Sequence, residues 1–350
     1  MSDHLEPVIL RADNFTPPAR TPWGGRRIVS HHKAGIDPAR FGVVGEAWEF
    51  SLDAAFPSRV ASPDWHRDAR LADVIAAEPR SWIGRDDGHI SLLLKLIDAG
   101  DQLSVQVHPS DSYAALEPGT CGKPEAWLVV AHEPGAGIWL GLADDISRED
   151  VEAALDAGAD LAPCLNFVPV AVGDAFVIAP GTVHAIGAGV TVVEPQLVHP
   201  DRSGVTYRFW DWGRRYGPSG VLDVAGTPRA LHREHALAVT GWDGLRGQAF
   251  VESRRYHPVV IEERAELLHQ LVLDLGPVSV ERLSGRGSFD IKTKSTLTVI
   301  YVLAGGLTFG AARRVERGGT VVVPAIFGTL AATLDADTDL LVLYDGPQGI

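Results

Sequence analysis

The sequence predicts a mainly β protein made of two related β-barrels in tandem, with a small number of helices added to the β framework. Many short apolar runs are separated by turn residues, among 37 glycines and 23 prolines in 350 residues, which is typical of antiparallel sandwiches and barrels. Each half also contains a run of similar pattern, VAVGDAFVIAPG (170–181) and VERGGTVVVPA (315–325). Helical periodicity is confined to a few segments. Two related barrels in tandem explain these observations most simply.

The expected strands are short apolar runs separated by turn residues such as glycine and proline. The clearest are SLLLKLIDA (91–99), EAWLVVAH (125–132), GVTVVEPQL (189–197), STLTVIYVLAG (295–305) and DLLVLYDG (339–346).

Three segments have the spacing of helices: 71–84, 147–165 and 231–241. The second opens with Ser147 and has Asp150 three residues later, an acidic variant of the capping box. After the third helix the composition becomes loop-like over 241–258 and then rich in strands. We therefore place a domain boundary near residue 255, which gives a first domain of 1–255 and a C-terminal barrel of 256–350.

Composition excludes several classes of protein. A formal net charge of −14 argues against general binding to nucleic acid or to an anionic membrane, which needs basic surface. Two cysteines, Cys121 and Cys164, are too few for a disulfide framework and indicate reduced thiols. The first residues lack the pattern of a secretion signal, and no apolar run is long enough to span a membrane. We expect a soluble, cytoplasmic monomer or dimer whose partner is a small molecule.

Four residues form a candidate metal site. Gln106 and His108 project from the same face of a strand, since they are two residues apart. Glu125 begins a later strand, and His184 follows a Pro-Gly turn. An amide oxygen, two imidazoles and a carboxylate suit zinc or another divalent first-row ion, with room for water or substrate. An open site of this kind indicates catalysis rather than a structural role.

A single histidine near a turn is usually only a hydrogen-bonding residue. The joint pattern carries the prediction, because successive barrel strands can point such residues inward. The paired histidines His31 and His32, and the helical His232 and His235, have no matching carboxylate, and we interpret them as surface residues.

Five motifs, in this order, resemble the type I mannose-6-phosphate isomerases, in particular their shorter bacterial branch: QLSVQVHPSD, GKPEAW, PGTVHAIG, EPQ with TYRFWDWGR, and PRALHREHAL. TPWGGRRI (21–28) and GEAWEFS (45–51) are similar to the family's amino-terminal elements. The resemblance is nearly continuous from about residue 20 to 240 and faint after 255.

This resemblance implies a tandem cupin fold. One zinc ion per chain would lie in the first barrel, 1–255, held by Gln106, His108, Glu125 and His184. The C-terminal cupin-like barrel, 256–350, has no histidine after the proline of VVVPAIFG (321–328), so we expect it to bind no metal and to cover the first barrel.

The resemblance also implies an activity, the interconversion of mannose 6-phosphate and fructose 6-phosphate through a cis-enediol. By motif position it makes Arg208 a catalytic arginine, which would stabilise the enediolate or orient the sugar. Lys123, beside the segment that carries Glu125, is expected to contact substrate. Glu194 would be the proton-transfer base or would orient a metal ligand.

Three further residues are assigned to substrate or phosphate binding. Lys95 is expected there or paired with a carboxylate, and Arg214 stands where a basic residue would help to bind the phosphate. Trp23 lies beside two glycines in a loop that looks exposed, which places it at the mouth of the site.

Two other functions are compatible with a cupin of this kind. One is a non-catalytic, sugar-phosphate-binding regulatory cupin, and the other is an iron-dependent cupin oxygenase. The four ligands with Arg208 and Lys123 argue against the first. A glutamine in place of a histidine argues against the second.

Overall fold

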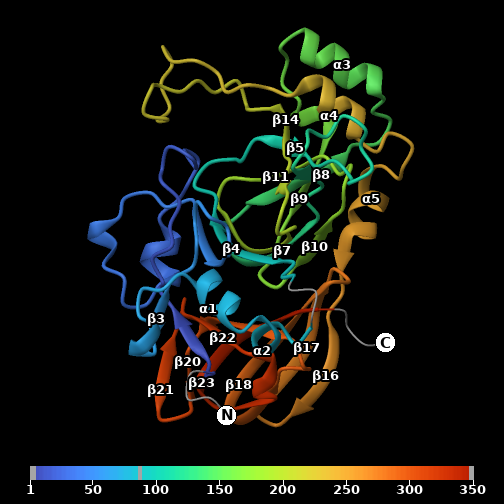
Figure 1. Ribbon diagram of the computed structural model, residues 1–350. Helices are drawn as coiled ribbons and strands as arrows, with labels where there is room; N and C mark the ends of the chain where they lie inside the picture. The colour runs from blue at the N-terminus through green and yellow to red at the C-terminus, as the bar shows by residue number, and fades with distance from the viewer. Residues whose placement is uncertain (1–4, 86–88, 347–350) are drawn as a thin grey trace.

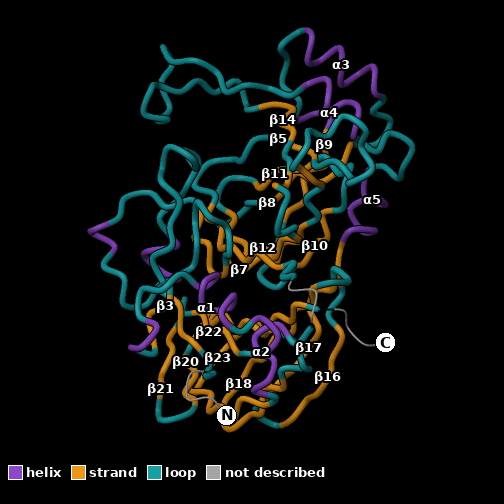
Figure 2. Tube along the Cα trace, viewed as in Figure 1, coloured by secondary structure: helices purple, strands orange, loops and turns teal. Residues whose placement is uncertain are grey.

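The computed structural model describes residues 5–85 and 89–346, and it is mainly β, as predicted (Figures 1 and 2). Its strands form a ten-stranded sheet, a six-stranded sheet, a five-stranded sheet and one two-stranded pair. The six- and five-stranded sheets occupy the upper half of Figure 1, and the ten-stranded sheet occupies the lower half.

The ten-stranded sheet carries most of the C-terminal part of the chain. Its main order is β16 (Val259–Arg264), β17 (Leu267–Asp274), β18 (Val278–Lys292), β23 (Thr329–Asp345), β19 (Leu297–Ala304), β22 (Thr320–Val323), β1 (Val8–Leu10) and β3 (Val60–Ser62). A hairpin of β20 (Gly306–Phe309) and β21 (Arg313–Glu316) pairs with β23. Two of its strands, β1 and β3, therefore come from the amino-terminal region.

The other sheets hold the motifs of the first half. The six-stranded sheet has the order β15 (Arg255–Tyr256), β10 (Ala175–Ile178), β7 (Glu125–His132), β12 (Val190–Leu197), β4 (Leu92–Asp98) and β2 (Glu46–Phe50). The five-stranded sheet has the order β14 (Tyr207–Trp210), β5 (Val105–Val107), β11 (His184–Ile186), β8 (Gly137–Leu142) and β9 (Leu165–Pro169). A short parallel pair joins β13 (Ser203–Gly204) to β6 (Thr120–Cys121).

In the described residues, five α-helices are added to the sheets: α1 (Leu71–Ala77), α2 (Pro79–Ile83), α3 (Arg148–Asp156), α4 (Arg233–Val239) and α5 (Gly247–Arg254). A short π-helix lies at η1 (Ile28–His32). Short 3-10 helices lie at η2 (Pro38–Arg40), η3 (Asp64–His66), η4 (Ala162–Cys164) and η5 (Ala325–Phe327). All three predicted helical segments contain helix, and the capping box of Ser147 and Asp150 is formed at the start of α3.

The predicted helix 147–165 and the predicted loop 241–258 both differ from the structure. The segment 147–165 is α-helical only to Asp156, because Gly158 takes a left-handed φ of 61° and ends it. The stretch 241–258, expected to be a loop, contains α5. Its Val251 is buried in the core of the first half, so tertiary packing rather than local pattern stabilises this short helix.

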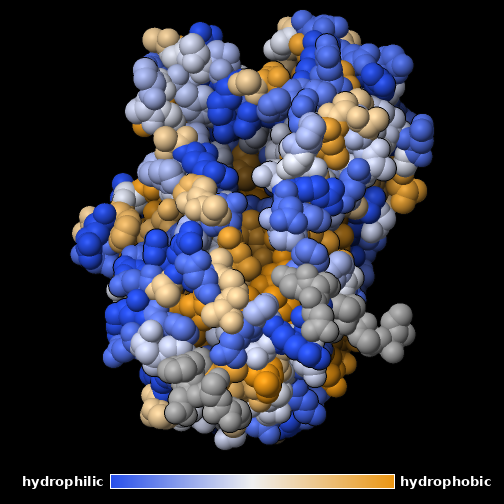
Figure 3. Space-filling model, viewed as in Figure 1, coloured by the Kyte–Doolittle hydropathy of each residue, from blue (hydrophilic) through white to orange (hydrophobic). Residues whose placement is uncertain are grey.

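One hydrophobic core connects the two halves. Buried residues of α1 and α2, among them Leu71 and Trp82, pack in a cluster with Leu94 of β4 and with Leu273 and Leu343 of the ten-stranded sheet. The division at residue 255 stays a prediction, and this shared core together with β1 and β3 ties the amino-terminal region to the C-terminal sheet. Figure 3 shows apolar residues gathered in the hollow between the halves on this face. No helix in the described ranges is long and apolar enough to cross a membrane.

Candidate metal centre and its surroundings

The predicted ligands come from neighbouring strands of the first half. Gln106 lies in the middle of β5, and His108 follows that strand directly. His184 opens β11 and is paired in register with Gln106. Glu125 opens β7 of the six-stranded sheet. Gly122 lets the segment before Glu125 pass close to the one after His108, because a Cβ at this position would lie 2.7 Å from the carbonyl oxygen of Pro109.

Two imidazoles and one carboxylate meet in the interior. The Nε2 atom of His108 lies 3.4 Å from Oε2 of Glu125, and Nε2 of His184 lies 3.5 Å from Oε1. One candidate ligand atom of each residue lies within 4.8 Å of the others, and all three side chains are fully buried. Within the described ranges, this is the only such group of three or more His, Cys, Asp or Glu residues.

The hydrogen bonds of the two imidazoles orient them for a metal ion. Nδ1 of His108 lies 3.1 Å from the carbonyl oxygen of Val205, and Nδ1 of His184 lies 2.8 Å from that of Thr182. A proton on each Nδ1 satisfies these contacts and leaves a lone pair on Nε2. Neither Nε2 has a hydrogen-bond partner in the part of the chain that the structure describes. Two buried acceptors therefore face one carboxylate, which is the donor set that a divalent ion completes.

The protonation states of these residues also suit a metal ion. Burial lowers the pKa of His108, and it lowers the pKa of His184 to about 3, so both rings are neutral at pH 7. Burial opposes the charge on Glu125, but Lys123 and His108 hold its pKa well below the usual range. Neutral imidazoles and an ionised carboxylate are the forms that bind a divalent cation.

Gln106 and Arg208 stand side by side beside this centre. Gln106 is paired in register with both His184 and Arg208, and directly paired residues of antiparallel strands project from the same face. Nη1 of Arg208 donates to the carbonyl oxygen of Ala230 at 2.9 Å, whereas its buried Nε has no hydrogen-bond partner among the described residues. Burial, together with nearby Arg229, lowers the pKa of Arg208.

Lys123 is the cation nearest to the candidate ligands. Its Nζ lies 3.0 Å from Oε2 of Glu125, and its side chain is 12% exposed. It faces the carboxylate from the same short segment, and it keeps a small path to solvent. The structure thus brings an ammonium group to the edge of the buried cluster.

Glu194 and Lys95 form a buried pair on the adjacent strands β12 and β4. Nζ of Lys95 donates to Oε1 of Glu194 and to Oε1 of Gln196, each at 2.8 Å. The other oxygen of Glu194 accepts from the indole N–H of Trp127 at 3.2 Å. Burial and the nearby charge of Glu125 raise the pKa of Glu194. Of the two roles expected for Lys95, the structure shows the pair with a carboxylate.

Two sequence predictions about position are corrected. Trp23 is not exposed at a mouth: it is 6% exposed and packs in the core of the first half. Its two glycine neighbours permit close approach to other backbone rather than marking an open loop, since a Cβ at Gly24 would lie 2.5 Å from the amide nitrogen of Gly45. His32, His232 and His235 are half-buried rather than on the surface.

The half-buried histidines take part in the local structure. Nδ1 of His232 accepts the backbone N–H of Arg208 at 3.0 Å. His235 stacks on Tyr207 and lies 2.9 Å from the hydroxyl of Tyr113 through Nδ1. α4 thus supports β14, the strand that carries Arg208.

Arg214 is held by carboxylates. Its guanidinium pairs with Asp211 at 2.6 Å and with Asp101 at 3.1 Å, and the side chain is only 9% exposed. Arg229, which the sequence interpretation left unassigned, donates through Nε and Nη2 to the same Asp211 at 2.7 and 2.6 Å. The signal that points to Arg229 is its place in PRALHREHAL, one of the ordered motifs.

Comparisons with known proteins agree with this architecture. Residues 19–141 match the model of the type I phosphomannose isomerase catalytic domain. Over this stretch the chain is similar to the type I phosphomannose isomerases. It is 36% identical over 220 residues to a mannose-6-phosphate isomerase of Streptococcus mutans, an alignment that covers 62% of this chain and 63% of that protein, less than two thirds of its length.

Solved phosphomannose isomerases share the cupin-like fold. The crystal structure of the mannose 6-phosphate isomerase from Bacillus subtilis has a TM-score of 0.78 and 24% identity, and the match covers 97% of this chain and 99% of that one. A zinc-bound holo form of a mannose 6-phosphate isomerase has a TM-score of 0.69 and 13% identity, with 97% and 100% covered. At these identities the likeness establishes the fold, and it agrees with the tandem cupin expected from the motifs.

Proposed function

We propose that this chain is a zinc-dependent isomerase that interconverts mannose 6-phosphate and fructose 6-phosphate. The observation that carries the proposal is the buried group of His108, Glu125 and His184, with both imidazole Nε2 atoms unpartnered among the described residues and facing one carboxylate. The mannose-6-phosphate isomerases among its relatives, and the zinc in one structure with this fold, support the choice of substrate and metal.

The donor set fits zinc. Two neutral imidazole nitrogens and a carboxylate oxygen are ordinary zinc ligands, and the amide oxygen of Gln106 on the adjacent strand is the proposed fourth. When bound, the ion supplies a Lewis acid that polarises substrate oxygens or orients hydroxyls.

The reaction moves a proton between C2 and C1 of the sugar through a cis-enediol. It needs a group that carries the proton and a cation beside the oxygen that becomes negative. Glu194 is our candidate for the proton carrier, since burial raises its pKa toward the range useful for exchange. In the same assignment, Arg208 stabilises the enediolate through its unpartnered Nε, and Lys123 contacts the substrate's oxygens.

The surrounding residues support these roles. Lys95 and Trp127 hold the two oxygens of Glu194 in place, so its orientation is set before substrate binds. The alternative role of Glu194 is to orient a metal ligand, and the same contacts with Lys95 and Trp127 suit that role. Arg214 is held by Asp101 and Asp211, and Arg229 pairs with the same Asp211. In our proposal the two arginines bind the phosphate together.

The experiment that tests the proposal measures fructose 6-phosphate formed from mannose 6-phosphate by purified protein. Turnover that is lost with a chelator and restored by zinc is the expected result. Folded, metal-loaded protein without turnover contradicts the proposal and favours the regulatory sugar-phosphate-binding cupin. Bound iron with oxygen uptake favours the oxygenase.

A further inference from the structure

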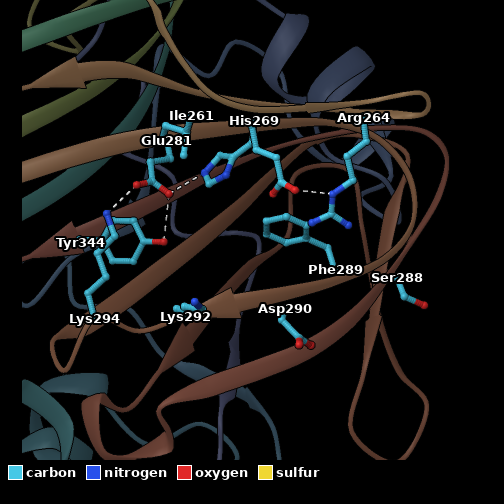
Figure 4. Close-up of a pocket in the computed structure, with 11 residues that line it drawn as sticks. Ile261, Arg264, His269, Glu281, Ser288, Phe289, Asp290, Lys292, Lys294 and Tyr344 are labelled. Atoms are coloured by element: carbon cyan, nitrogen blue, oxygen red, sulfur yellow. Dashed lines mark hydrogen bonds and ion pairs between the residues drawn. The ribbon is translucent and has the colours of Figure 1, made fainter.

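A polar cavity lies in the C-terminal half, on strands β16, β17, β18 and β23 of the ten-stranded sheet (Figure 4). Its volume is about 650 Å³. In register, Glu281 pairs with Leu271 on one side and with Val342 on the other. These residues project from the same face of the sheet. Val342 belongs to the hydrophobic core of this half, so Glu281 faces the interior of the C-terminal barrel. Small-molecule sites often occur in the mouths of β-barrels.

Glu281 anchors one end of the cavity and is only 4% exposed. It accepts hydrogen bonds from Nε2 of His269 at 2.7 Å, from Nζ of Lys294 at 2.5 Å and from the hydroxyl of Tyr344 at 3.2 Å (Figure 4). Burial opposes its charge, but His269 and Lys294 lower the pKa of Glu281 below its ordinary value. Three donors from different elements on one buried carboxylate form a preorganised polar network.

Three cations, Arg264, Lys292 and Lys294, line the cavity together with three carboxylates, Glu262, Glu281 and Asp290. Lys292 and Lys294 are two of only five lysines in the chain, and both line the cavity. Arg264 lines it from β16 and pairs with Glu262 at 2.5 Å, an exposed contact of the kind that contributes little stability. Lys292 has no carboxylate partner in the described part of the chain. Among the described residues Lys292 is the unpaired cation of this lining, and a phosphate would share Lys294 with Glu281 and Arg264 with Glu262.

The remaining lining suits a ligand with hydroxyl groups and an apolar face. Phe289 lies between the two polar ends in Figure 4, with the Arg264 guanidinium 5.7 Å from its ring centre. His269 meets the edge of the same ring at 5.5 Å. Asp290 is exposed at the cavity and offers a carboxylate that can accept hydrogen bonds from hydroxyls. Cations, one exposed acceptor and an aromatic face thus line one space of small-molecule size.

We propose that this cavity is a second ligand site, which binds a phosphorylated sugar. The phosphate accepts hydrogen bonds from Lys292, Lys294 and Arg264, the hydroxyls donate to Asp290, and the C–H face of the ring packs on Phe289. The site shares no residue with the candidate metal centre, and the proposal goes beyond the proposed isomerase activity without depending on it.

Hydrogen exchange of the full-length protein, with fructose 6-phosphate as the probe, locates binding at each site separately. We expect the probe to protect peptides from 259–294 in the wild-type protein. Lys292→Glu should weaken that protection, raising its concentration midpoint by about tenfold or more, because one cation on the phosphate is replaced by an anion. Protection near Gln106 and Glu125 should be the same in both proteins.

Arg40→Glu makes the same change of charge at an exposed position outside the cavity, and it serves as the matched control. Lys292→Gln is a milder second variant, in case the charge reversal perturbs folding. The proposal is overturned if 259–294 is unprotected in the wild type, or if the Lys292 variants match the control. Inorganic phosphate that protects 259–294 at the same concentration as fructose 6-phosphate overturns the role assigned to the sugar.

Discussion

The ligands of the candidate metal centre are set by hydrogen bonds to their own neighbours. The carbonyl oxygens of Val205 and Thr182 accept from the two imidazoles and turn the free nitrogens inward. Lys123 keeps Glu125 ionised before any metal binds. A ring or carboxylate that is already oriented loses less entropy when it coordinates, so these contacts favour metal affinity.

Replacement of His184 by alanine tests the ligand assignment. We expect His184→Ala to fold but to lose stoichiometric metal and isomerase turnover, because the removed Nε2 atom faces the shared carboxylate. Metal analysis and the fructose 6-phosphate assay measure the two effects. His257→Ala is the control, since His257 has a side chain 72% exposed and lies outside the cluster. Full metal content with full turnover in His184→Ala would show that the assignment is wrong.

Arg208→Ala is expected to keep its metal and lose turnover by about a hundredfold, or ~2.7 kcal/mol, if the unpartnered Nε contacts the enediolate. Comparison of kcat with KM distinguishes loss of a transition-state contact from loss of ground-state binding. Arg215→Ala removes an exposed arginine that follows the same strand, and it should leave turnover unchanged. Unchanged kcat in Arg208→Ala would return this residue to a purely structural role.

Among the structural elements, strands and caps follow local pattern closely. The apolar runs from 91–99 and 125–132 form β4 and β7, because residues that are β-branched or buried on both faces fit a central strand. The start of α3 is equally local, since Ser147 and Asp150 satisfy each other's backbone N–H groups. α5 has no such signal and depends on the sheet beneath it.

Ser147→Ala should destabilise α3 by about 1 kcal/mol, because the backbone N–H of Asp150 loses its side-chain acceptor. Faster amide exchange over 148–156, with unchanged isomerase turnover, is the expected result. Ser112→Ala changes an exposed serine outside any helix and provides the comparison. Exchange rates equal to wild type in Ser147→Ala would mean that packing of Val151, rather than the cap, holds the helix.

At the level of the complete chain, a buried ion pair of the amino-terminal region is hydrogen-bonded to the C-terminal half. Nζ of Lys33 contacts Glu49, and it also donates to the carbonyl oxygen of Gly318 at 2.7 Å. Both side chains are almost completely buried, at 0% and 3% exposed. Together with β1 and β3, these contacts connect the amino-terminal region to the C-terminal half.

Lys33→Met is expected to lower the free energy of unfolding by about 3 kcal/mol or more, because it leaves the Glu49 carboxylate buried without its cation. Adding Glu49→Leu should recover most of that loss, since two apolar residues often replace a buried pair at little cost. Urea unfolding of the single and double variants measures both values. A double variant as unstable as Lys33→Met would contradict this explanation.

His32 makes stability depend on pH at the boundary between the halves. It lines a cavity of about 140 Å³ with Leu128 of β7 and Asp339 of β23, and burial lowers its pKa from 6.5 to about 4. In the unfolded chain the pKa of His32 returns to its ordinary value of 6.5, so unfolding takes up a proton between pH 4 and pH 6.5. The free energy of unfolding should therefore fall as pH decreases from 6.5 to 4, by up to about 3 kcal/mol.

The test compares wild type with His32→Asn by urea unfolding across that pH range. On acidification the free energy of unfolding should fall more in the wild type than in His32→Asn. The wild-type value minus the variant value should therefore decrease as the pH falls. A difference that stays constant from pH 6.5 to 4 would show that His32 does not contribute this proton uptake.

Much of this protein follows from its sequence. Strand identity, the cap of α3 and the expected tandem cupin come from local patterns and ordered motifs, which report neighbours along the chain. The spacing of Gln106, His108, Glu125 and His184 also predicts candidate ligands, and the fold brings both histidines and the carboxylate together. Their role in binding metal remains part of the proposal.

Contacts between distant segments depend on the tertiary structure. It buries Trp23, pairs Arg214 and Arg229 with Asp211, and places β1 and β3 in the C-terminal sheet. It also forms the open polar cavity beside Glu281. No local periodicity contains this information, because the free energy of burying a side chain or pairing a charge depends on partners that only folding brings near.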